Sequence, residues 1–168
     1  MRRVAVVICS ALVIAACTDQ PDAAPTTNGA LQPNGLVVYV VDGDTVDIDV
    51  DGTEERVRLI GIDTPETKKQ DSPVECFGPE ATAFTTSLLP VGTPVYLERD
   101  VEARDQYGRL LAYVYRADDG VFVNLEIVRQ GYAQPLTIPP NVAHSDEFVE
   151  AARAAEATDA GLWASCSG

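Results

Sequence analysis

Residues 36–63 read LVVYVVDGDTVDIDVDGTEERVRLIGID and contain three strand-like runs in close succession. The run at 36–41 is apolar, the run at 45–51 alternates apolar with acidic side chains, and the run at 55–62 is again strand-like. The dipeptide at 51–52 is Asp-Gly, and Asp-Gly between such runs is a strong hairpin signal. The stretch therefore predicts three strands, with the last two joined by a two-residue turn.

The rest of the chain adds two more strands and three helices. A helix begins at Gly78 with proline in its first turn, and Ser145 can cap a last helix that stops at Gly161. The remaining elements are strands at 95–101 and 110–115 and a short helix at 123–129. Five strands and three helices, the first helix lying between the third and fourth strands, predict an α+β fold rich in barrel structure. The expected architecture is a five-stranded OB-fold (oligonucleotide-binding) barrel with three helices.

The beginning of the chain has the pattern of an exported protein. Two arginines precede an apolar run at 4–16, which has the length of a signal-peptide core but is short for a membrane span. Its small residues before Cys17 resemble the bacterial lipobox, in which that cysteine is lipidated. An ordinary signal peptide cut nearby and a retained membrane helix are the alternatives.

Three regions follow from this pattern. We expect residues 1–16 to be a lipoprotein-type signal peptide and 17–35 to be the anchored cysteine with a disordered tether rich in Pro, Thr, Asn and Gly. Residues 36–168 would form the folded domain. The protein would then face outward as a lipoprotein of the cell membrane, attached through Cys17, or be released from the cell.

Two cysteines remain after export, Cys76 and Cys166. In an oxidising compartment a pair of cysteines is most simply a disulfide. A zinc site is a poor rival, because the chain has one histidine and no CxxC pair.

The chain is strongly acidic, with a formal net charge of −14. A protein that grips nucleic acid by releasing counterions is expected to be basic. Any role with nucleic acid must therefore be short-ranged and carried by a local site or a bound cation, while the overall field opposes approach. A solubility adaptation of an exported protein is the simpler explanation of the charge.

Acidic residues gather at the ends of the predicted strands. A two-residue turn at 51–52 would place Asp44 opposite Leu59 and Asp42 opposite Gly61, so that Asp44 and Asp63 approach each other on one face. Two carboxylates with a peptide carbonyl and water suit a hard cation. Acids at strand ends also form turns, and the pattern alone leaves both interpretations open.

Residues 47–52 match the opening of an EF-hand calcium loop, but Arg58 stands where that loop needs a bidentate acid, which argues against an EF-hand.

Two arginines favour a cation site at the strand ends. Arg58 and the distant Arg109 could instead hold phosphate oxygens while a cation polarises the phosphoryl group, as phosphodiester cleavage requires. In a flat, regular pair of strands, the side chain of Arg58 would point to the opposite face of the sheet from that of Asp44. A site that contains both therefore needs a bulge or strong coiling of the barrel.

Five motifs then resemble one known family. They read VDGDT at 41–45, RLIGIDTPE at 58–66, FGPEA at 77–81, DQYGR at 105–109 and VRQG at 128–131. In this order and spacing they closely resemble the staphylococcal nuclease, or thermonuclease, family over about residues 36–163.

The resemblance implies an OB-like barrel that cleaves DNA and RNA with Ca²⁺, has little sugar specificity and leaves 3′-phosphate ends. Matched residue by residue, Asp44, Asp63 and the carbonyl of Thr64 would hold the cation. Glu66 would act through water, either as general base or as organiser of the attacking water.

The same match assigns the phosphate contacts. Arg58 and Arg109 would clamp the reacting phosphate, and Tyr107 would contact the terminal phosphate of a bound nucleotide. No protein partner is implied, and a monomer is expected.

The sequence also departs from the family. Leu136 and Ile138 occupy a proline-rich loop where the family has nucleotide-stacking tyrosines, and Gln106 replaces a lysine. Of a basic loop after Glu66 only Lys68 and Lys69 remain. We therefore expect an intact catalytic centre with weaker substrate binding or a different base preference.

Two other functions fit the same barrel. A non-catalytic module that binds nucleic acid or protein is expected to have lost the arginines or the glutamate of the site, and an extracellular calcium-binding structural domain would need neither arginine. Because Arg58, Glu66 and Arg109 all remain, a phosphodiesterase is the expected function.

Overall fold

The protein was analysed as a computed structural model that describes residues 31–67 and 73–166. The expected signal peptide, Cys17 and most of the tether lie outside these residues, as do Lys68 and Lys69. Within the two described ranges, no helix has the length and apolar character needed to cross a membrane.

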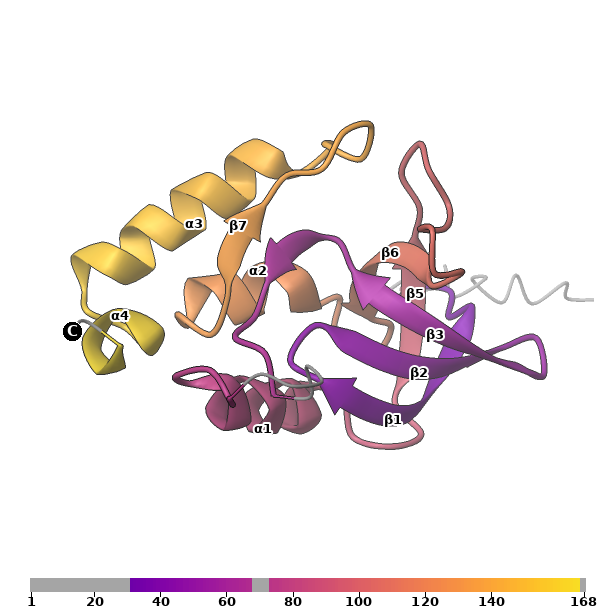
Figure 1. Cartoon of the computed structure of the whole chain (residues 1–168). Helices are drawn as coiled ribbons and strands as arrows, with labels where there is room; N and C mark the ends of the chain where they lie inside the picture. Colours follow the sequence, from indigo (N-terminus) through magenta and orange to yellow (C-terminus); the bar gives the residue numbers. More distant parts are fainter. Residues whose placement is uncertain (1–30, 68–72, 167–168) are drawn as a thin grey trace, which may run out of the picture.

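Five strands form a closed barrel in the order β1-β2-β3-β6-β5 (Figure 1). Their bounds are Gly35–Asp42 for β1, Thr45–Val50 for β2, Thr53–Leu59 for β3, Pro94–Glu98 for β5 and Leu110–Arg116 for β6. Neighbouring strands are antiparallel except β3 and β6, which are parallel. The predicted five-stranded barrel is confirmed.

The β2–β3 hairpin has the predicted two-residue turn. Asp51 and Gly52 have φ angles of 54° and 81°, as a type I′ turn requires. The turn sets a register in which Val50 faces Thr53 and Thr45 faces Arg58. The inward side chains of Val46, Ile48, Val57 and Leu59 are completely buried, so a slip of one residue would expose these apolar side chains.

The predicted strand at 55–62 is two strands rather than one. β3 ends at Leu59, and β4 (Gly61–Asp63) leaves the barrel to pair with β7 (Gln134–Leu136), part of the segment expected as a loop. Gly61 has φ +83°, and a Cβ atom there would lie 2.2 Å from the ring of Phe148. A glycine is therefore required at the point where the chain turns away from the barrel.

The described residues contain four helices: α1 (Gly78–Leu88), α2 (Val123–Arg129), α3 (Ser145–Ala157) and the one-turn α4 (Leu162–Ser165). The three predicted helices are confirmed, and α4 is additional. α1 packs against β1, while α2 and α3 pack together beside β4 and β7 (Figure 1). Cys76 and Cys166 form the predicted disulfide, which joins the segment before α1 to the end of α4.

The folded part begins earlier than expected. Leu31 donates a main-chain hydrogen bond to Ala117, and the amide side chain of Asn34 exchanges two hydrogen bonds with the backbone of Leu97. Leu31 and Asn34, which the sequence placed in the tether, therefore pair with the barrel, and Gly35 is the first residue of β1.

Candidate active site

Asp44 lies in the turn between β1 and β2. β1 extends to Asp42, which pairs with Thr45, so the expected position of Asp42 opposite Gly61 is wrong. The main chain of Leu59 donates a 2.8 Å hydrogen bond to the carbonyl of Asp44, which confirms the predicted pairing of those two residues. Asp44 is thus fixed at the end of the barrel, outside the alternation of the strands.

A residue that the motifs did not indicate holds this turn. The hydroxyl of Thr85, fully buried in α1, donates a 2.7 Å hydrogen bond to the carbonyl of Gly43. A Cβ atom at Gly43 would lie 2.6 Å from the Thr64 hydroxyl, so the glycine permits close approach of the two segments. The only signal for Thr85 in the sequence is a polar residue four positions after Ala81 on the apolar side of a helix.

Arg58 links the two acidic segments of the site. Its Nη2 atom lies 3.0 Å from a carboxylate oxygen of Asp44 and 3.0 Å from one of Asp63. Its Nη1 atom donates to the carbonyls of Leu59 and Ile62 at 2.8 and 3.1 Å. The guanidinium is therefore held on one side by the main chain and on the other by carboxylates.

The geometry explains how Arg58 and Asp44 share a site despite the strand alternation. Asp44 belongs to a turn, where its side-chain direction is not set by the pleat. The bend at Gly61 brings Asp63 back alongside the same guanidinium. The turn and the bend, together with a register irregularity in β1 between Val40 and Asp42, do what was expected of a bulge or strong barrel coiling.

Burial raises the pKa of the Asp44 carboxyl to about 6, and nearby Asp42 and Asp63 add to the rise, while Arg58 and the Thr64 amide oppose it. The Thr64 amide donates to the same carboxylate at 3.0 Å. Only 8% of the Asp44 side chain is exposed, against 57% for Asp63. Asp44 is therefore a carboxylate that the fold makes costly to ionise, which is typical of functional sites.

This gives a prediction for stability against pH. Because the folded-state pKa of Asp44 exceeds the ordinary aspartate value of 3.8, the folded protein binds an extra proton between pH 3.8 and about 6, and its stability falls as pH rises through that window. Asp44→Asn should remove this slope. In chelator at pH 7 it should raise the free energy of unfolding by roughly 1 to 3 kcal/mol. Urea unfolding of both proteins from pH 4 to 7.5 measures this, and parallel curves with no gain at pH 7 would contradict it.

Arg109 reaches the site through the parallel pairing of β3 with β6. Val57 faces Leu110 in that pairing, so Arg109 lies just before the paired part of β6, beside β3. Its Nε donates to Asp105 at 2.7 Å, and its guanidinium lies 5.7 Å from the ring centre of Tyr107. Burial opposes ionisation of Asp105, but hydrogen bonds from Arg109 and Tyr107 outweigh it and lower the pKa of Asp105.

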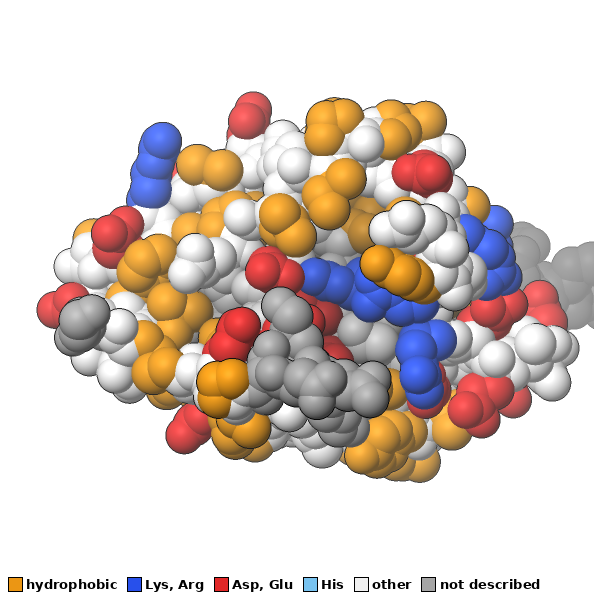
Figure 2. Space-filling view, in the orientation of Figure 1, with side chains coloured by type: hydrophobic (Ala, Val, Ile, Leu, Met, Phe, Trp, Pro, Cys, Tyr) orange, Lys and Arg blue, Asp and Glu red, His pale blue; other side chains and the backbone are white. Residues whose placement is uncertain are grey.

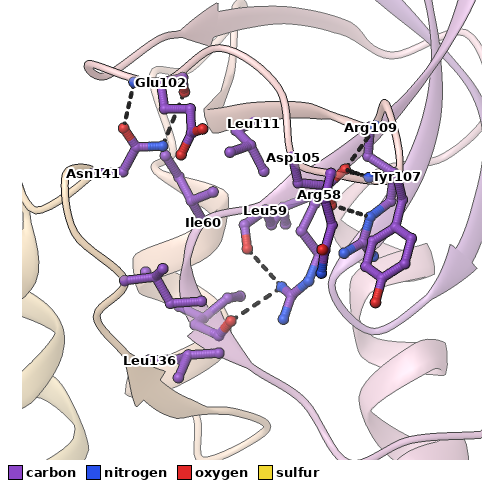
Figure 3. Close-up of a pocket in the computed structure, with 14 residues that line it drawn as sticks. Arg58, Leu59, Ile60, Glu102, Asp105, Tyr107, Arg109, Leu111, Leu136 and Asn141 are labelled. Atoms are coloured by element: carbon purple, nitrogen blue, oxygen red, sulfur yellow. Dashed lines mark hydrogen bonds and ion pairs between the residues drawn. The ribbon is translucent and has the colours of Figure 1, made fainter.

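Arg58, Arg109 and Tyr107 meet at a pocket of about 460 Å³ (Figure 3). Leu136 and Ile138 also line it. Figure 2 shows basic side chains crossing the front of the molecule beside a group of acidic ones, with apolar side chains above them. The ring of Tyr107 is 76% exposed and so is open to a ligand. The pocket has basic groups for a phosphate and apolar walls for a base, but aliphatic rather than aromatic side chains at 136 and 138.

Glu66 lies close in sequence to the acidic cluster but does not line the pocket. Its side chain is exposed and makes no hydrogen bond or ion pair with the described residues. Its main-chain amide, by contrast, is fixed by a 3.1 Å hydrogen bond to a carboxylate oxygen of Glu75.

The carboxylates around Arg58 provide some of the oxygen ligands that a hard cation needs. In residues 31–67 and 73–166, no group of three His, Cys, Asp or Glu side chains could hold a metal ion. Two carboxylates, of Asp44 and Asp63, nevertheless converge on one positively charged nitrogen. A cation there would need main-chain carbonyl oxygen and water as its other ligands, which calcium and magnesium accept.

The barrel defines the class of the protein as an OB-fold domain, in which the guanidinium groups of Arg58 and Arg109 line one pocket and Arg58 also contacts two carboxylates.

Comparison with known proteins gives the family. The profile described as "Staphylococcal nuclease homologue" matches residues 56–165. The thermonuclease of Staphylococcus intermedius is 42% identical over 128 residues, covering 76% of this chain and 74% of the relative, and that of Staphylococcus hyicus is 30% identical over 162 residues, covering 94% of each. The SPbeta prophage-derived endonuclease YokF of Bacillus subtilis is 38% identical over 125 residues, which is 73% of this chain and 41% of the relative. The chain belongs to the staphylococcal nuclease family, as the five motifs indicated.

Proposed function

We propose that the protein is a calcium-dependent nuclease that cleaves DNA and RNA with little sugar specificity and leaves 3′-phosphate ends. That it is a nuclease, a hydrolase of phosphodiester bonds, follows from its family. The cation and the products are the finer parts of the proposal. The observation that carries the cation is the Arg58 guanidinium, 3.0 Å from each of two carboxylates and opening onto the pocket that Arg109 also lines. The products are carried over from the family resemblance.

Asp44, Asp63 and the carbonyl of Thr64 are the proposed ligands of Ca²⁺. When bound, the cation would supply Lewis-acid polarisation of a phosphoryl oxygen. The raised pKa of Asp44 supports this role, because a positive ion would relieve the cost of its buried charge. With two carboxylates in the set, water must complete the coordination, as hard-cation sites allow.

Arg58 and Arg109 are the proposed phosphate clamp. Main-chain carbonyls hold Nη1 of Arg58, so the direction of the guanidinium is set before substrate arrives. Asp105 orients Arg109 in the same way. Two preoriented guanidinium groups can donate hydrogen bonds to phosphate oxygens as negative charge builds on them. Tyr107, whose ring lies beside Arg109, is proposed to contact a terminal phosphate.

Glu66 is the proposed partner of the attacking water. An exposed carboxylate with no partner among the described residues is free to accept a proton from water or to orient it. Its position three residues after Asp63 keeps it close to the proposed cation site.

Digestion of single-stranded DNA by the purified protein tests this function. We expect cleavage in Ca²⁺, loss of cleavage in excess chelator, and products that a 5′-kinase labels without prior phosphatase treatment, because hydrolysis that leaves a 3′-phosphate exposes a 5′-hydroxyl. Glu66→Ala should lower kcat by at least about 100-fold. Undiminished cleavage in chelator would rule out the calcium mechanism. Absence of cleavage with any divalent cation by a folded, disulfide-bonded protein would favour the non-catalytic binding module.

Export and anchoring remain part of the proposal. We retain residues 1–16 as a signal peptide and Cys17 as the lipidated residue of an outward-facing membrane protein, and we propose that the domain acts as a monomer. Cys17→Ser should move the protein from the membrane fraction to the soluble fraction. An unchanged distribution would show that the anchor is wrong.

A further inference from the structure

The main chain around Glu66 is fixed by a reciprocal pair of hydrogen bonds with Glu75. The amide of Glu66 donates to a carboxylate oxygen of Glu75 at 3.1 Å, and the amide of Glu75 donates to the carbonyl of Glu66 at 2.9 Å. Glu75 therefore holds both polar main-chain groups of the proposed catalytic residue. Nothing in the family motifs marks Glu75, which lies just before the motif that begins at Phe77.

Glu75 is itself held by its neighbours in sequence. Cys76 is joined by the disulfide to Cys166. The ring of Phe77 stacks on Tyr132 with 5.2 Å between ring centres, and the amide of Gly78 donates to the carbonyl of Glu75 at 3.1 Å. Three residues in a row thus tie the Glu75 segment to α4, to the end of α2 and to the start of α1.

The start of α1 also packs directly on the Glu66 segment. A Cβ atom at Gly78 would lie 3.0 Å from the carbonyl oxygen of Pro65 and 3.1 Å from that of Glu66. The segment that carries Glu66 is therefore sandwiched between the Glu75 side chain and the first turn of the helix. Its exposed side chain can move while its backbone is held.

We infer that Glu75 is a positioning residue for Glu66, and that the Cys76–Cys166 disulfide keeps Glu75 in place. The inference rests on the proposed function, in which Glu66 works on the attacking water. A carboxylate that is aimed from a fixed backbone samples fewer unproductive directions, so loss of Glu75 lowers kcat and leaves KM nearly unchanged.

Two variants of Glu75 distinguish the loss of its hydrogen bond to Glu66 from the loss of its charge. Glu75→Gln keeps an acceptor oxygen for the Glu66 amide and removes the charge, whereas Glu75→Ala removes both. We expect Glu75→Ala to lower kcat about 3- to 10-fold, the size expected for one hydrogen bond, and Glu75→Gln to restore most of the rate. Glu80→Ala, which removes an exposed acid in the first turn of α1, is the matched control for charge.

A second measurement does not depend on activity. Amide hydrogen exchange at Glu66, followed by NMR in the full chain, should be about 3- to 10-fold faster in Glu75→Ala and close to wild type in Glu75→Gln. The double variant Cys76→Ser with Cys166→Ser should accelerate the same exchange and lower kcat in the same direction, at a temperature where thermal unfolding shows it folded.

The outcomes decide the inference. Equal kcat and equal Glu66 exchange in Glu75→Ala and Glu80→Ala would overturn it, and so would a Glu75→Gln variant as impaired as Glu75→Ala. Wild-type exchange in the double cysteine variant would remove the disulfide from the inference. If the wild-type protein does not cleave nucleic acid in Ca²⁺, the proposed function fails, but the exchange measurement still reports whether Glu75 holds Glu66.

Discussion

Replacing Arg58 with alanine is expected to lower kcat/KM on single-stranded DNA by on the order of 10³- to 10⁴-fold. Among residues 31–67 and 73–166, Arg58 is the one whose guanidinium both contacts Asp44 and Asp63 and lines the pocket shared with Arg109. Its loss removes a phosphate donor and leaves the buried Asp44 carboxylate without its positive partner. The pKa of Asp44 should therefore rise further, which weakens any site that needs it ionised.

Two controls make this result specific. Arg58→Lys keeps the charge but cannot donate in a fork to two groups, so it should recover only a small part of the lost rate. Arg129→Ala removes the same charge from α2, where the arginine pairs with Glu126 away from the pocket, and should leave the rate within about twofold. Comparable losses in Arg58→Ala and Arg129→Ala would mean that net charge, rather than the proposed clamp, controls the reaction.

Replacing Gly61 with alanine is expected to lower the free energy of unfolding by roughly 3 to 5 kcal/mol. Two costs add at this position. An L-residue at φ +83° is strained, and its Cβ atom would lie 2.2 Å from the ring of Phe148. Phe148 is 1% exposed and packs against Tyr113 and Phe122, so it cannot move aside cheaply. Urea unfolding followed by the fluorescence of the single tryptophan, Trp163, measures the loss.

Gly92 supplies the matched control. Its φ is +84°, yet a Cβ atom there would meet nothing within 4 Å, so Gly92→Ala carries the backbone strain without the collision. We expect it to cost about 1 to 2 kcal/mol. If Gly61→Ala cost no more than Gly92→Ala, the close contact with Phe148 would not be what requires glycine at the β3–β4 bend.

Local patterns predicted much of the fold because their rules act over short distances. The Asp51–Gly52 turn and the alternation on either side of it specify the register of one hairpin, and that register places Asp44 opposite Leu59 as expected. The helix starting at Gly78 follows from proline and an acid in its first turn. The cysteine count was enough to predict the disulfide.

Most of the errors involve pairing between distant segments. β4 and β7 are three residues each, and they exist because Gly61 lets the chain turn toward residues 134–136. The pairing of Leu31 and Asn34 with the barrel likewise depends on partners that no local pattern names. Thr85 is a further case, since its role comes from the turn that it contacts in another segment. The pairing of Asp42 with Thr45 is the exception, because it is a local turn that the strand pattern did not show.

By itself, the sequence determined the five barrel strands, three of the helices, the hairpin and the side chains available for the chemistry, because propensity, periodicity and turn geometry act between neighbours. Only the tertiary structure decided which of those side chains meet. The parallel pairing of β3 with β6 brings Arg109 to β3, the bend at Gly61 returns Asp63 to Arg58, and Glu75 reaches the backbone of Glu66. These contacts exist because the barrel closes and buries one shared core, and the free energy of that closure belongs to no single segment of the chain.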